Sequence, residues 1–142
     1  MLNKKHTIAH DDRERVLIAI KGALEERPEI SFAYVHGSFL KDEGFGDIDL
    51  ALYLKDSPGS PLQYELAMET DIMKVAGKYL IDVRLLNAAP LSFRYNVLKE
   101  GKSLVVRNDD ERAGFIEATL ADYFDFAPYR AQYLKETLGL GV

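Results

Sequence analysis

The sequence predicts a mixed α/β (α+β) domain in which a small sheet of about four strands is flanked by helices. Segments rich in β-branched and aromatic residues alternate along the chain with segments whose apolar residues recur at helical spacing. The first two expected strands are joined by fewer residues than the dozen or so that a parallel crossover needs. We therefore expect these two strands to pair antiparallel, in a sheet that is not doubly wound.

The first half of the chain predicts one helix and two strands after a loose leader over residues 1–10. Apolar residues at helical spacing behind an acidic start predict a helix over residues 11–26. Residues 30–37 are β-branched and aromatic and stop at a glycine, which is typical of a strand. A second strand is expected over residues 47–54, where Asp-Ile-Asp opens an apolar run.

The second half predicts two helices that alternate with two strands. A cluster of Pro, Gly and Ser residues precedes a helix expected over residues 62–78. Residues 79–87 predict a third strand, because their apolar and polar side chains alternate. Pro90 opens the next helix and Gly101 ends it, and residues 102–108 predict a short fourth strand.

The C-terminal segment is helical from Asp109 onward and is expected to be interrupted at Ala127-Pro128, because proline removes a helical hydrogen bond. It holds six aromatic residues, most of which we expect to pack in the core. Alternatively, Tyr129, Tyr133 and Leu134 form a face for a partner helix. Residues 109–142 are therefore the candidate partner-binding part of the chain.

Composition narrows the class of protein. The 142 residues carry a formal net charge of −5 and 47 % hydrophobic residues, which fits one acidic domain over residues 1–142. A negative chain has no long-range attraction to nucleic acid, so direct nucleic-acid binding is not expected. The chain has no cysteine, which excludes disulfides and thiolate chemistry. No signal peptide or membrane span is visible, so we expect a cytoplasmic protein that is not bound to a membrane.

Three aspartates form the first chemical motif. Asp47 and Asp49 lie one residue apart at the start of a strand, so their side chains share a face, and Ile48 and Leu50 point to the core. If the third strand lies beside the second, Asp82 lies ~4.8 Å away across the ladder. Crowded carboxylates repel one another, and a cation between them removes that conflict. Oxygen ligands without nearby thiolate or imidazole favour Mg²⁺ or Mn²⁺ over zinc.

A Gly-Ser pair forms the second motif. Gly37 permits an unusual backbone conformation, and Ser38 can cap a short helix whose free N–H groups face an anion. Such an anion cradle beside metal-binding carboxylates suits a nucleoside triphosphate with Mg²⁺. Arg84 shares a face with Asp82 and either contacts phosphate or neutralises the carboxylates. His36 is expected to be a strand-end residue near the pocket, because no nucleophile-elbow pattern surrounds Ser38.

These motifs resemble a known family. Gly37-Ser38, then DIDL over residues 47–50, then Asp82 on a later strand resemble the signature of polymerase-β-type nucleotidyltransferases. The stretches YLIDVRLLNAAP, RYNVLKEGKSLV and ADYFDFAPYRAQYL resemble, more narrowly, the minimal nucleotidyltransferase (MNT) antitoxins of HEPN/MNT toxin–antitoxin pairs. The resemblance covers residues 11–138 and implies the nucleotidyltransferase fold.

The resemblance also implies roles for individual residues. Ser38 and the backbone of Gly37 would hold the β- and γ-phosphates of ATP, and Lys41, at a position where a basic residue is often found, would contact phosphate. The aspartates of the first motif would ligate the metal, and Asp82 would also help to deprotonate the attacking hydroxyl. Members of the family transfer AMP from ATP to a tyrosine of a HEPN toxin, an RNase, and so silence it. The loop before Asp47 is shorter here than is common, and it ends in Gly46 where serine is usual.

Three functions remain open from the sequence. The first is a Mg²⁺-dependent antitoxin that adenylylates a HEPN-domain toxin with ATP as substrate. The second is a nucleotidyltransferase that modifies a small molecule, of the kind that adenylylates aminoglycosides. The third is an antitoxin that blocks its toxin by binding alone. The aromatic residues of the C-terminal segment suggest this function.

Overall fold

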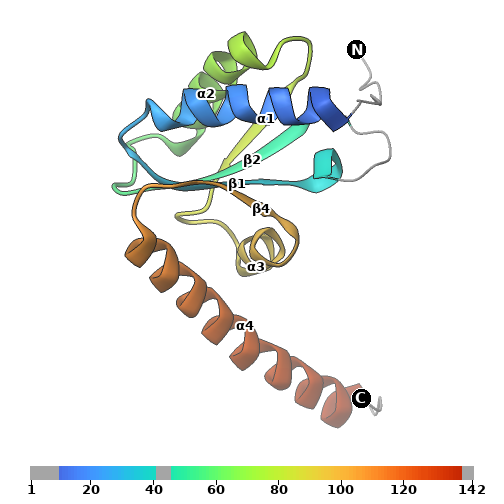
Figure 1. The fold of residues 1–142 in the computed structure, drawn as a ribbon. Helices are drawn as coiled ribbons and strands as arrows, with labels where there is room; N and C mark the ends of the chain where they lie inside the picture. The colour runs from blue at the N-terminus through green and yellow to red at the C-terminus, as the bar shows by residue number, and fades with distance from the viewer. Residues whose placement is uncertain (1–9, 41–45, 139–142) are drawn as a thin grey trace.

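A four-stranded mixed sheet in the order β3-β2-β1-β4 forms the centre of the fold (Figure 1). The structure is a computed structural model that describes the backbone of residues 10–40 and 46–138 and the side chains of residues 12–40 and 46–125. Strand β1 pairs antiparallel with β2 and with β4, whereas β2 and β3 run parallel. The expected antiparallel pairing of the first two strands is confirmed. The strands are β1 (Ile30–His36), β2 (Ile48–Leu54), β3 (Ile81–Leu85) and β4 (Lys102–Val106).

Helices cover both faces of this sheet (Figure 1). Helices α1 (His10–Glu25) and α2 (Pro61–Ala76) lie on one face. Helix α3 (Leu91–Glu100) and the first turns of α4 (Asp109–Leu138) lie on the other face, and α4 then leads away from the sheet. A short 3₁₀ helix, η1 (Gly37–Leu40), follows β1 directly.

Alternation along β2 directs its apolar residues to the α1/α2 face. Ile48, Leu50 and Leu52 are fully buried there, as their parity predicts. The opposite face also carries a core, in which Ala51 and Phe32 pack beneath α3 and α4. Because this second core covers only part of that face, the acidic start of β2 lies beyond it, half-buried.

Several expected boundaries shift by a few residues, and one expectation is wrong. The third strand covers Ile81–Leu85 and is therefore shorter than the expected 79–87. Helix α4 continues without a break from Asp109 to Leu138, although an interruption was expected at Ala127-Pro128. Proline gives up one backbone N–H, but the turns on either side of it keep their hydrogen bonds and the helix continues.

Parts of three expectations fall outside the described residues. These are the leader, of which residues 1–9 are not described, the loop at 41–45 that contains Lys41, and the side chains of Tyr129, Tyr133 and Leu134. None of the described helices is long and apolar enough to cross a membrane.

Candidate active site

Three neighbouring strands bring the candidate residues to one row. In the parallel pairing of β2 with β3, Asp49 lies directly opposite Asp82, as the sequence predicts. On its other side Asp49 lies opposite His36, the last residue of β1. Neighbouring strands are ~4.8 Å apart, so Asp49 and Asp82 lie within direct electrostatic range.

Asp47 lies in the bend before β2 rather than in the strand itself. Its Oδ1 is buried and has no hydrogen-bond partner among the described residues. A buried carboxylate oxygen without a partner is costly, because it has lost its water without gaining a donor or a cation. Asp47 is therefore well suited to a cation ligand.

Asp49 shows the electrostatic effect of this crowding. Burial first, and then the charges of Asp82 and Asp47, raise the pKa of Asp49 to about 6, while Arg84 acts in the opposite direction. Like charges disfavour ionisation of their neighbours, and a cation placed among them reverses that effect. The chemistry of this donor set, hard oxygen atoms from carboxylates, fits Mg²⁺ or Mn²⁺.

The carboxylates do not by themselves complete a metal site. Within the described part of the chain, no group of three or more His, Cys, Asp or Glu side chains is arranged so that it could hold a metal ion. The convergence of Asp47, Asp49 and Asp82 on one ion therefore stays a prediction, supported by the register and by the orphaned oxygen of Asp47.

The Gly-Ser motif lies where β1 passes into η1. Gly37 has φ +79°, a left-handed conformation that favours glycine. The expected short helix is present as η1, but Ser38 is its second residue and so lies within it rather than capping it. The predicted phosphate contacts of Gly37 and Ser38 remain predictions, and Lys41 lies outside the described residues.

An aromatic residue that the sequence reasoning missed joins this site. The ring of Phe93, from α3, lies edge-on to His36 with 5.4 Å between the ring centroids. The Arg84 guanidinium lies 5.8 Å from the centroid of the same ring. Burial lowers the pKa of His36, which favours the neutral imidazole. Nothing in the sequence separates Phe93 from an ordinary helix residue, because its role arises only from contacts between distant segments.

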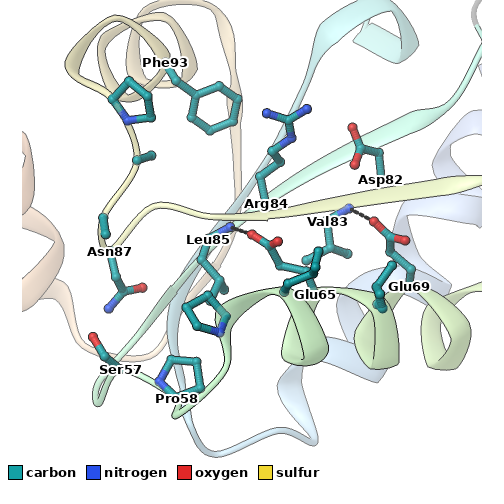
Figure 2. Close-up of a pocket in the computed structure, with 16 residues that line it drawn as sticks. Ser57, Pro58, Glu65, Glu69, Asp82, Val83, Arg84, Leu85, Asn87 and Phe93 are labelled. Atoms are coloured by element: carbon teal, nitrogen blue, oxygen red, sulfur yellow. Dashed lines mark hydrogen bonds between the residues drawn. The ribbon is translucent and has the colours of Figure 1, made fainter.

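A cavity of about 530 Å³ opens beside the row of carboxylates, along the free edge of β3 (Figure 2). Asp82 and Arg84 rise from β3 on one side of this cavity, and Glu65 and Glu69 of α2 approach β3 from the other. The two glutamates were not predicted. Their spacing in the sequence places them on one helix face, but it does not say which backbone groups they meet.

Comparison with known proteins gives one family and a shared fold. Residues 19–110 match the family model described as polymerase beta, nucleotidyltransferase. No curated protein matches the chain.

Several solved structures with this fold come from toxin–antitoxin complexes. A chain of a tri-AMPylated Shewanella oneidensis HEPN toxin in complex with MNT antitoxin aligns with a TM-score of 0.68 and 17 % identity, over 89 % of this chain and 98 % of that one. A chain of the toxin–antitoxin MntA-HepT gives 0.67 and 17 %, over 88 % and 98 %. A chain of a toxin–antitoxin with AMP-PNP gives 0.69 and 18 %, over 86 % and 98 %. At these identities the similarity establishes the fold.

Proposed function

Because the chain belongs to the polymerase beta nucleotidyltransferase family, we propose that it is a Mg²⁺-dependent adenylyltransferase that acts as an antitoxin. It transfers AMP from ATP to a tyrosine hydroxyl of a HEPN-domain RNase and so neutralises that toxin. The observation that carries the proposal is the register that sets Asp49 opposite Asp82 on β2 and β3, with Gly37 at the end of the neighbouring β1.

Structures with the same fold support the choice of substrates. One is from a complex that contains a tri-AMPylated HEPN toxin, and another is from a toxin–antitoxin with AMP-PNP. We propose the same two substrates, ATP and a HEPN-domain protein, for this chain. We further propose that residues 1–142 are one domain and that residues 109–142 contribute to partner binding, since α4 leads away from the sheet (Figure 1).

In the proposed reaction, the site residues bind phosphate, accept a proton and would hold the metal ion, and Asp82 has two of these tasks. The backbone of Gly37 and the hydroxyl of Ser38 hold the β- and γ-phosphates. Asp82 accepts the proton of the attacking hydroxyl, whose oxygen bonds to the α-phosphorus as the bond to the β-phosphate oxygen breaks and pyrophosphate leaves. Asp47, Asp49 and Asp82 would hold a metal ion, which would supply positive charge to the reacting phosphates. Arg84 contributes a further positive charge at the same edge of the sheet.

The test uses ATP labelled at either the α- or the γ-phosphate, with a HEPN-domain RNase as the acceptor. Label from the α-phosphate should appear on the RNase, its mass should rise by AMP units, and its RNase activity should be lost. Asp47→Asn should abolish the transfer, because it removes a negatively charged ligand. Asp56→Asn is the matched control, since Asp56 is an exposed aspartate in the turn after β2.

Two outcomes would contradict the proposal in different ways. Transfer of label from the γ-phosphate would make the protein a kinase. Full neutralisation of the RNase by Asp47→Asn would mean that the antitoxin acts by binding alone.

A further inference from the structure

The cavity along the β3 edge is continuous with the candidate active site. Its walls include Asp82 and Arg84 from β3 and Phe93 from α3, all close to the row of carboxylates (Figure 2). Its other wall is the first half of α2. With a volume of about 530 Å³, it is large enough for two or three amino-acid side chains but is not filled by the side chains that surround it.

The free edge of β3 is closed to a further strand. The N–H of Val83 donates a hydrogen bond to Glu69, and the N–H of Leu85 donates one to Glu65. The N···Oε2 distance is 2.9 Å in both. These are the backbone donors that an added strand would need, because alternate residues of a strand point their N–H groups to the same side. We therefore expect a polypeptide in this cavity to bind mainly through its side chains.

The lining is largely apolar, and its charged residues are three carboxylates, from Glu65, Glu69 and Asp82, and one cation, Arg84, so its net charge is negative. Leu62 and Leu66 of α2 line the cavity although they are 64 % and 53 % exposed, and the buried Val83 lies at its floor. Glu65 and Glu69 each use one carboxylate oxygen for β3, which leaves the other oxygen free to accept from a cation. The lining is complementary to an apolar side chain next to a basic one.

The chemistry of the proposed reaction also points to this side. The candidate phosphate cradle at Gly37 lies at the end of β1, and the strand order places β3 on the other side of β2. Attacking and leaving oxygens of a phosphoryl transfer lie roughly in line, on opposite sides of the phosphorus. With pyrophosphate leaving toward Gly37, the acceptor hydroxyl approaches from the side of Asp82 and β3.

We therefore propose that the cavity between α2 and β3, which we call the α2–β3 groove, binds the acceptor polypeptide. The occupant is an extended segment that carries the acceptor hydroxyl and, beside it, an apolar and a basic side chain. This inference rests on the proposed function for the identity of the acceptor. Binding in the groove is nevertheless measurable without any transfer of AMP.

The experiment is an NMR titration of the isotope-labelled protein without nucleotide. The probe is a short peptide with one tyrosine, leucines and arginines; a second peptide has glutamates in place of arginines, and a single-stranded RNA oligonucleotide is the third. The arginine peptide should shift the amide signals of Leu62, Leu66 and Leu85. Leu62→Arg/Leu66→Arg should weaken its binding at least about tenfold, because the two arginines fill the groove and cancel its net negative charge.

Ile18→Arg and Val75→Arg are the matched controls. Both replace apolar residues that are exposed on α1 and α2, and neither residue lines the groove. These variants should bind the peptide as the wild-type protein does. The hydrogen-exchange rates of the Val83 and Leu85 amides should change little when the peptide is bound, since no strand is added and both N–H groups keep their glutamate acceptors.

Each result decides the inference. No binding of the arginine peptide, equal binding by Leu62→Arg/Leu66→Arg, or stronger binding of the glutamate peptide or of RNA would overturn it. A large gain in amide protection at Val83 and Leu85 would show that a strand had been added and would also overturn it. If the peptide binds in the groove but no AMP reaches a HEPN-domain RNase, the proposed function fails while the groove stands as a peptide site.

Discussion

The Asp49 carboxylate occupies the space that a side chain at position 37 would need. A Cβ built on Gly37 would overlap Oδ2 of Asp49, and the φ of Gly37 is +79°. Glycine is thus required at this position both by the backbone conformation and by the neighbouring carboxylate. This contact joins the two sequence motifs, because Gly37 belongs to the candidate phosphate cradle and Asp49 to the candidate metal ligands.

We expect Gly37→Ala to abolish AMP transfer and to lower the free energy of unfolding by about 1–2 kcal/mol. The left-handed conformation of residue 37 costs about that much in any residue with a Cβ. In addition, the new methyl group must displace the carboxylate of Asp49. Transfer of labelled AMP and thermal unfolding measure the two effects.

The control for Gly37→Ala is Gly77→Ala. Gly77 has a similar φ of +81° at the end of α2, but nothing lies within 4 Å of a Cβ placed there. Gly77→Ala should therefore lose a similar amount of stability and keep its activity. Equal activity of the two variants would mean that Asp49 need not lie against residue 37.

Asp49→Asn should stabilise the metal-free protein at pH 7 while it abolishes transfer. The pKa of Asp49 rises from 3.8 to about 6, so between these values the folded protein binds a proton that the unfolded chain does not. Stability therefore falls as the pH rises through this window, and the charged carboxylate is a net cost at pH 7. Since Asp49 is only half-buried, screening leaves about 1 kcal/mol, or about 3 °C in Tm.

The pH dependence separates this effect from a general one. The difference in Tm between Asp49→Asn and the wild-type protein should be largest at pH 7 and should shrink as the pH is lowered through about 6. Asp56→Asn, at an exposed position, should show no such trend. A Tm advantage of Asp49→Asn that persists unchanged at pH 4 would contradict the argument.

The features that could be predicted from the sequence are those set by the alternation of side chains along a strand and by short connections. The parity of β2 and β3 placed Asp49 and Asp82 on one side of the sheet and Leu50 and Val83 on the other, and the structure agrees. The short connection between β1 and β2 likewise fixed their antiparallel pairing. Such features depend on neighbours in the chain, so they can be predicted without knowledge of the tertiary structure.

The features that could not be predicted depend on contacts between distant segments. Phe93 lies beside His36, and Glu69 accepts a hydrogen bond from the N–H of Val83, but no local pattern specifies either pair. The predicted break in α4 was wrong for the opposite reason. A local rule about Pro128 was given more weight than the helical segments on either side of it.

Glu69→Ala should expose the edge of β3. The N–H of Val83 loses the carboxylate that accepts it, so its hydrogen exchange should accelerate by about tenfold or more, whereas the Leu85 amide, which donates to Glu65, should change little. Glu69→Gln is the control, since its amide oxygen can still accept. Unchanged exchange of Val83 in Glu69→Ala would show that the carboxylate does not hold the strand edge.

Mg²⁺ should raise the Tm of the wild-type protein and should have much less effect on Asp49→Asn. An ion that binds only the folded protein adds about 2.7 kcal/mol at a concentration of 100 Kd, and it also cancels the repulsion that raises the pKa of Asp49. The order of stability of the two proteins should therefore reverse on addition of Mg²⁺, and a chelator should restore it. The unfolding measurement needs neither ATP nor an acceptor, so it can be made even if the partner is unknown. A wild-type Tm that does not change on addition of Mg²⁺ or Mn²⁺ would contradict the metal assignment.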